Sequence, residues 1–163
     1  MLERCIATLQ KMYLRNDNIN QFKDEKLEYQ NVVFVAHKYD GKKQNMDEVE
    51  RIVCDLQARF PDHLFVSPIH TFGMLYDKTD YDVGEKMCLW LLNHCDQMWV
   101  FGDNWSTSEG VKREIEFCAA RGIPVSFANP DNDIVISSRQ YFTDDCHNIN
   151  NIWDSTEVIW ERG

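Results

Sequence analysis

Residues 108–129 read SEGVKREIEFCAARGIPVSFAN, which predicts a loop, a helix and a buried strand in that order. Gly110 stands where the loop meets the helix, and we expect Glu114 on the first turn of that helix. The apolar run at the end of the stretch is typical of a strand buried on both faces of a parallel sheet. A loop, helix and buried strand in this order are typical of an α/β fold.

The rest of the chain continues this alternation. Short apolar runs predict strands over 31–37, within 63–70 where Pro68 stops the strand, and over 96–103 and 123–129. Apolar residues at helical spacing predict helices over 1–15, 46–60 and 85–95, with a long loop over 71–84. TEVIWE, residues 156–161, is a candidate fifth strand. We therefore expect a three-layer α/β/α sandwich with a mostly parallel sheet of four or five strands, Rossmann-like or flavodoxin-like.

The length of 163 residues corresponds to about one domain. We expect an N-terminal helix and connector over 1–30, the α/β domain over 31–129, and a C-terminal tail over 130–163 that packs on the same domain. A hydrophobic content of 44% with 12% aromatic residues indicates a globular chain rather than a disordered one.

Charge and composition exclude several classes of partner. The net charge is −10 without a basic block, so we expect no nucleic-acid polymer as partner. No apolar run approaches the ~18 residues of a membrane span, and no signal peptide is recognisable, so we expect a cytoplasmic protein without a membrane partner. The six cysteines form no CxxC pair and are expected to be reduced thiols, mostly in the core. We expect no metal, and Gly102–Asp103 lacks the dinucleotide fingerprint, so we expect no cofactor either.

The predicted fold locates the site before any motif does. Parallel strands end at one edge of a sheet, and ligands of open α/β sheets bind outside that edge, where the strand order reverses. The segments expected there are 36–45, 68–82 and 102–114. They supply the candidate substrate-binding residues His37, Tyr39, Asp40, His70, Asp82, Asp103, Ser108 and Gly110.

Several pieces of the sequence resemble the nucleoside 2-deoxyribosyltransferase superfamily. CDQMWVFGD (95–103) is followed by Ser108-x-Gly110-x-x-x-Glu114 and then by GIPV (122–125). VVFVAHKYDG (32–41) and VSPIH (66–70) are similar to the first strand and the second-strand exit of its uncharacterised bacterial and phage branch, known only as domains of unknown function. The resemblance covers roughly residues 31–129, and its serine–glycine–glutamate element is moderately specific in this position.

The resemblance implies a reaction at the anomeric carbon of a nucleoside or nucleotide, without a cofactor. Glu114 would attack C1′ and displace the base, and the covalent glycosyl ester would pass to water or to another base. A helix N-terminus would keep Glu114 ionised at neutral pH. Gly110 would leave room for the sugar, and Ser108 would meet a sugar hydroxyl or a 5′-phosphate.

One residue departs from the pattern of the superfamily. Its members carry a catalytic Asp eight residues before the Asp that opens the third strand, and this chain has Cys88 at that distance from Asp96. A thiol of ordinary pKa is a poor proton donor to a departing base. Glu85 lies three residues earlier on the same helix face and is the candidate acid, with Asp80 and Asp82 as alternatives.

Simpler interpretations stand beside these. Glu114 fits a solvated first turn, Ser108 an N-cap, and the two histidines ordinary loop residues. The whole pocket equally fits a non-catalytic sensor of a nucleotide-derived ligand, an alternative that Cys88 favours. The apolar run Met87–Leu92 and the Trp-rich tail predict a homodimer or a larger homo-oligomer.

Overall fold

The computed structural model describes residues 31–128 and 134–137. Its sheet has the strand order β2-β1-β3-β4-β5. The first four strands are parallel: β1 (Asn31–Ala36), β2 (His63–Val66), β3 (Gln97–Val100) and β4 (Val125–Ala128). β5 (Ile134–Ser137) joins β4 in the antiparallel direction. The predicted α/β class with a mostly parallel sheet is confirmed.

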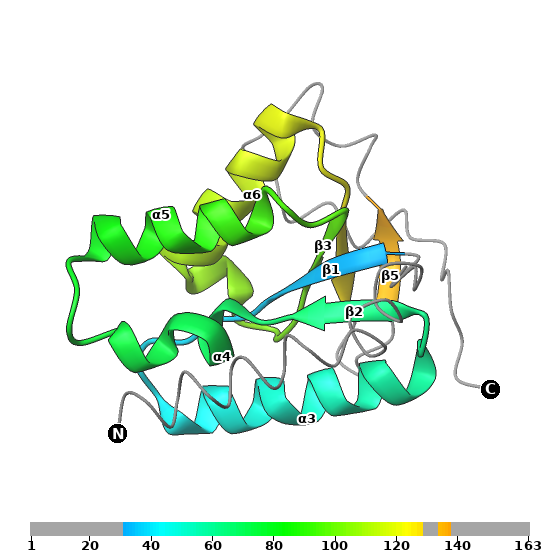
Figure 1. Ribbon diagram of the computed structural model, residues 1–163, viewed down its shortest axis with the longest axis horizontal. Coiled ribbons are helices and arrows are strands. Elements are labelled where there is room, and N and C mark those ends of the chain that lie inside the picture. The colour runs from blue at the N-terminus through cyan, green and yellow to red at the C-terminus, as the bar shows by residue number, and fades with distance from the viewer. Residues whose placement is uncertain (1–30, 129–133, 138–163) are drawn as a thin grey trace, which may run out of the picture.

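Helices cover both faces of this sheet, as Figure 1 shows. The longest, α3 (Lys43–Arg59), lies on one face, and α5 (Tyr81–Leu92) and α6 (Glu109–Arg121) lie on the other. Short helical segments follow β2 and β3: α4 (Pro68–Phe72), η1 (Gly73–Leu75) and η2 (Trp105–Thr107). None of the helices in the described ranges is long and apolar enough to span a bilayer.

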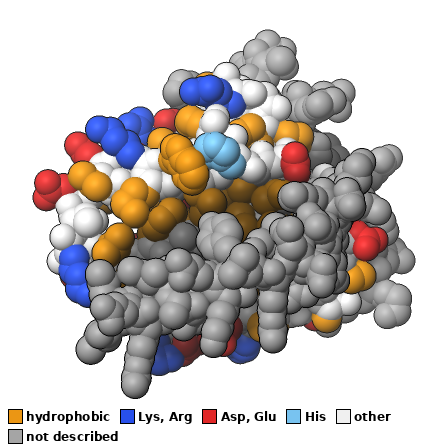
Figure 2. All heavy atoms as spheres, in the orientation of Figure 1, with side chains coloured by type: hydrophobic (Ala, Val, Ile, Leu, Met, Phe, Trp, Pro, Cys, Tyr) orange, Lys and Arg blue, Asp and Glu red, His pale blue; other side chains and the backbone are white. Residues whose placement is uncertain are grey.

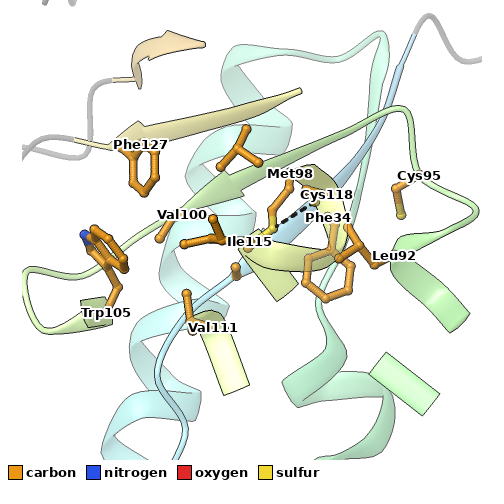
Figure 3. Packing of buried hydrophobic residues seen from close by; sticks show 12 residues of the cluster. Phe34, Leu92, Cys95, Met98, Val100, Trp105, Val111, Ile115, Cys118 and Phe127 are labelled. Carbon is orange, nitrogen blue, oxygen red and sulfur yellow. Dashed lines mark hydrogen bonds between the residues drawn. The ribbon is translucent and has the colours of Figure 1, made fainter. Parts of the chain in front are cut away.

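The two faces of the sheet bury alternate residues of the same strands. Phe34 and Val100 point toward α5 and α6, where they pack with Leu92, Val111 and other apolar residues (Figure 3). Their chain neighbours point the other way and pack against α3, as the pleat of a strand requires. Within the first cluster the Cys118 thiol donates to Met98 Sδ at 3.5 Å, so this cysteine is part of the core.

The prediction of a loop over 71–84 was wrong, because this segment contains helical turns that begin before it. Ser67 caps α4 by accepting a hydrogen bond from the backbone N–H of His70, and Pro68 occupies the first turn, where its missing N–H costs nothing. The turn of η1 follows directly, and α5 starts at Tyr81 instead of residue 85. The expected helix over 1–15 and strand over 156–161 lie outside the described residues.

The strand order also fixes where a ligand can enter. The chain passes from β1 outward to β2 and then back across β1 to β3, so the connections leave the sheet on opposite faces. Between β1 and β3 the loops at the carboxyl edge diverge and leave a crevice. The segments that follow β1, β2 and β3 all lie at this edge.

Candidate functional site

A cavity of about 570 Å³ opens at the carboxyl edge of the sheet. Its walls come from the segments after β1, β2 and β3 and from one side of α5. Seven of the ten site residues expected from the sequence line it: His37, Tyr39, Asp40, Glu85, Ser108, Gly110 and Glu114. The other three, His70, Asp82 and Asp103, are exposed and do not line it.

Glu114 is the most buried carboxyl group of this cavity, with 8% of its surface exposed. It makes no hydrogen bond or ion pair with any residue in the described ranges. Burial, and then the negative charge of Glu85, raise the pKa of Glu114 to about 8. The expectation of an ionised first-turn glutamate was therefore wrong. Because α6 begins at Glu109, Glu114 belongs to the second turn, where the helix N-terminus has little influence.

The raised pKa makes stability depend on pH in a defined direction. Between the ordinary value of 4.5 and about 8, the folded chain holds a proton on Glu114 that the unfolded chain has lost. Its contribution to stability is therefore complete below pH 4.5 and is lost as pH rises through about 8. Glu114→Gln removes this loss, and we expect the variant to exceed wild type by about 2–4 kcal/mol at alkaline pH.

Urea unfolding of both proteins across the pH range measures this difference. The matched control is Glu116→Gln, on the same helix but with a side chain that is 70% exposed, which we expect to show no such pH-dependent gain. A constant difference between wild type and Glu114→Gln from pH 5 to pH 9 would contradict the raised pKa.

Glu85 is the second carboxyl group at the cavity and has a cationic partner. Arg113 donates from Nε to Glu85 Oε1 at 3.1 Å, across 28 positions of sequence. The Glu85 side chain is 15% exposed, whereas that of Arg113 is 59% exposed and is not among the lining residues. Glu85 thus accepts a hydrogen bond from a guanidinium, a role that suits a base better than a proton donor.

Cys88 also lines the cavity, one helical turn after Glu85. Burial, and then the charges of Glu114 and Glu85, raise the pKa of the Cys88 thiol to about 12. The thiol is therefore neutral, and such a weak acid gives up its proton slowly. The position at which the sequence resemblance implies a carboxylic acid is thus occupied by a neutral thiol in the cavity wall.

His37, the first residue after β1, is held by a hydrogen bond to the backbone and by the close approach of Gly102. The Nδ1–H of His37 donates to the carbonyl of Lys38 at 2.7 Å, and its Nε2 faces Glu48 Oε2 at 3.6 Å. Gly102 has a φ of +84°, and a Cβ there would lie 2.9 Å from His37 Nε2. Glycine is thus required at Gly102 for both its backbone conformation and its approach to the histidine.

An aromatic wall closes one side of the cavity. The rings of Tyr39 and Tyr76 meet edge to face with centroids 5.1 Å apart. Each ring also covers a glycine of the opposite segment, because a Cβ on Gly41 would lie 2.8 Å from Tyr76 and one on Gly73 would lie 3.3 Å from Tyr39. Tyr39 was expected from the sequence, whereas the other lining aromatics, Phe72, Tyr76 and Tyr81, were not. Phe72 ends α4, Tyr76 follows η1 and Tyr81 begins α5, so no single periodicity in the sequence marks the three residues together.

Ser108 and Gly110 lie together at the N-terminus of α6. The Ser108 hydroxyl caps the helix by accepting a hydrogen bond from the Val111 N–H at 3.4 Å, as its simpler interpretation predicts. A Cβ on Gly110 would meet its nearest protein atoms at 3.9 and 4.0 Å, which is ordinary contact. The protein's own packing therefore does not require glycine at this position, and the glycine leaves that space to the cavity.

A family model with the description "Domain of unknown function (DUF7768)" matches residues 31–128, more than half of the chain. The chain belongs to the DUF7768 family. The matched DUF7768 segment contains every residue of the cavity wall. A search of the curated proteins found no match.

The DUF7768 domain is also similar to a solved structure, a conserved protein from Enterococcus faecalis V583. The two share 14% sequence identity with a TM-score of 0.50, over 63% of this chain and 65% of that one. At this identity the likeness concerns the fold alone. Neither comparison links the DUF7768 domain to the nucleoside 2-deoxyribosyltransferase superfamily, so the resemblance stays a hypothesis.

Proposed function

We propose that this protein cleaves the bond between base and sugar in a nucleoside or nucleotide through a covalent glycosyl ester on Glu114. The observation that carries the proposal is the pair of carboxyl groups, Glu114 and Glu85, at one cavity with unlike surroundings. Glycosidases that retain the configuration of the anomeric carbon typically use two carboxyl groups in different environments.

The first half of the reaction uses Glu114. Its carboxylate attacks C1′ of the sugar, the bond from C1′ to the base nitrogen breaks, and the electron pair of that bond leaves with the base. Since Glu114 holds a proton below about pH 8, it must give that proton up before attack. We therefore expect base release to increase as pH rises toward 8.

The second half uses Glu85. Glu85, which accepts a hydrogen bond from Arg113, is positioned to take a proton from a water molecule that attacks C1′ of the glycosyl ester. The ester bond breaks, the free sugar leaves, and Glu114 regains its carboxylate. This assigns Glu85 the role of base, and the Cys88 thiol is too weak an acid to protonate the base in the first half.

Chromatography of free base tests the proposal. The protein is incubated with ribo- and deoxyribonucleosides, their 5′-monophosphates and glycosides with better leaving groups, beside a Glu114→Ala control. Release that depends on Glu114, together with a glycosyl adduct on the peptide that contains it, supports the proposal. Ligand binding without any base release would contradict it.

Gly110→Ala is a separate test of where the sugar lies. A Cβ there meets no protein atom closer than 3.9 Å, and alanine is the better helix former by about 1 kcal/mol, so we expect an equally stable fold. The added methyl group occupies cavity space, and we expect kcat/KM for base release to fall by about 10- to 100-fold. Unchanged kcat/KM with an unchanged melting temperature would place the sugar elsewhere.

Cys88 favours a second candidate, a sensor that binds a nucleotide-derived ligand without cleaving it. A neutral thiol in place of a carboxylic acid is what a site that has lost its acid would show. In this case ligands would raise the melting temperature of the protein, and Glu114→Gln would change the affinity without changing the amount of free base.

We also propose that the protein forms at least a homodimer. The α5 residues Val83 and Trp90 are 47% and 64% exposed, and Figure 2 shows hydrophobic side chains gathered along this helix. Exposed apolar side chains of this size are typical of an interface. Light scattering is expected to give a mass of at least twice the 19.3 kDa of the chain, and a monomer at micromolar concentration would contradict the proposal.

A further inference from the structure

We infer that the preferred substrate is an N-glycoside whose base already carries a positive charge, such as an N-ribosylpyridinium or an N7-alkylated purine nucleoside without a 5′-phosphate. This inference rests on the proposed function and names the substrate class for the same cavity. Three features of the cavity support it: its charge, the unsuitability of Glu85 and Cys88 as proton donors, and its aromatic wall.

The cavity presents carboxyl groups and lacks lysine and arginine among its described lining residues. Its acidic residues are Asp40, Asp80, Glu85, Glu109 and Glu114. Lysine or arginine partners of three of these stand outside the lining: Lys38 for Asp40, Arg113 for Glu85 and Lys112 for Glu109. Asp80 has no ion-pair partner among the described residues, and neither has Glu114, which becomes an anion as pH rises through about 8. A ligand therefore meets negative charge, and a cation is attracted where a phosphate is repelled.

Negative charge at the cavity also raises the pKa values of side chains in its wall. Partial burial, and then the charges of Glu85 and Glu109, raise the pKa of the Tyr81 phenol above its ordinary value. The charge of Glu85 acts in the same direction on Glu114. A cation bound between these groups would favour the ionised form of Glu114, so the substrate itself would help to generate the nucleophile.

The leaving group makes the second point. A neutral base departs with an extra electron pair on nitrogen and needs a proton at that moment. The Glu85 carboxyl accepts a hydrogen bond from Arg113, which suits a base, and the Cys88 thiol has a pKa of about 12, so neither of these two residues is a suitable donor. A cationic base needs no donor. When its bond to C1′ breaks, the electron pair neutralises the positive ring, and water later releases the sugar from Glu114.

The aromatic wall makes the third point. Tyr39, Phe72, Tyr76 and Tyr81 all line the cavity. The face of an aromatic ring attracts a flat cation, in addition to ordinary stacking on a base. A positively charged heterocycle would bind favourably to both the aromatic wall and the carboxyl groups, whereas a neutral base would gain from the aromatic wall alone.

Two comparisons of substrates test the inference. Nicotinamide riboside is compared with inosine, and 7-methylguanosine with guanosine, where a single methyl group adds the charge. Rates measured with Glu114→Gln are subtracted to remove spontaneous hydrolysis. We expect kcat/KM for each cationic substrate to exceed that of its neutral counterpart by about 10²–10⁴-fold. We also expect the 5′-phosphate of nicotinamide riboside to be cleaved less efficiently than the nucleoside.

The outcomes separate this inference from the proposed function. Release of guanosine's base at a rate equal to that of 7-methylguanosine, in a Glu114-dependent manner, would overturn the inference and leave the proposed function standing. More efficient cleavage of the 5′-phosphate of nicotinamide riboside than of the nucleoside would overturn the inference that the substrate is unphosphorylated. Failure to release base from any of these substrates, with release from another member of the wider panel, would overturn the inference alone, whereas failure on the whole panel would overturn both proposals.

Asp80→Asn tests the electrostatic part alone. Asp80 precedes α5 and lines the cavity, but its side chain makes no capping hydrogen bond, so the variant is expected to fold normally. We expect KM for nicotinamide riboside to rise by about two- to fivefold at low salt, and the effect to shrink at high salt. The matched control, Asp77→Asn, removes the same charge from an exposed residue outside the lining and is expected to leave KM unchanged. Equal KM values for wild type and Asp80→Asn would contradict attraction by the cavity.

Discussion

Glu114→Gln is expected to abolish base release while leaving the protein folded. The amide has nearly the shape of the carboxylic acid that Glu114 forms below about pH 8, so the buried site accepts it without a new charge. An amide cannot form the glycosyl ester, and the covalent route is therefore closed. We expect a loss of at least about 10⁴-fold in kcat, measured by chromatography of free base at pH 8.

Two controls distinguish the loss of the nucleophile from a general effect of the substitution on folding. Glu116→Gln lies two residues further along the same helix, with an exposed side chain, and is expected to retain wild-type kcat. Circular dichroism and the melting temperature show whether Glu114→Gln is folded. Base release at the wild-type rate by a folded Glu114→Gln protein would exclude Glu114 as the nucleophile.

Cys88→Asp is expected to create or accelerate the release of neutral bases. Residue 88 faces the cavity, where burial and the charges of Glu114 and Glu85 already raise the pKa of the thiol to about 12. The same surroundings would raise the pKa of a new carboxyl group and keep it protonated at neutral pH. Such a group can donate a proton to a departing purine, and we expect a gain of about 10²–10⁴-fold with inosine.

The size of the gain should depend on the leaving group. A cationic base needs no proton, so Cys88→Asp should leave the cleavage of nicotinamide riboside within about threefold of the wild-type rate. Cys88→Asn, which has the same shape and no acidic proton, is the matched control and should give no gain with inosine. Thermal melts of both variants measure the cost of placing a polar group at this half-buried position. A stable Cys88→Asp protein that still fails to cleave inosine would show that a missing acid does not limit the reaction.

The sequence by itself determined the architecture and the edge at which the cavity lies. Apolar runs such as Val33–Ala36 and helix-spaced apolar residues such as Val49, Ile52 and Leu56 record which residues are buried, and this pattern is local. The alternation of strands and helices implied a parallel sheet, and a parallel sheet places the ends of its strands together. Gly110 and Glu114 were recognisable because their spacing lies within a single segment.

Only the tertiary structure decided the chemical state of the candidate site. The sequence placed Glu114 near a helix N-terminus and predicted an anion, but its burial and its closeness to Glu85 depend on how α5 packs against α6. The pairing of Glu85 with Arg113 joins residues 28 positions apart, and the contact of Tyr39 with Tyr76 joins two loops. Electrostatic energies depend on the distance between charges and on the exclusion of water, and neither can be inferred from the local pattern of a sequence. The fold was therefore predictable from the sequence, whereas the raised pKa of Glu114 depends on contacts that form only when the helices meet.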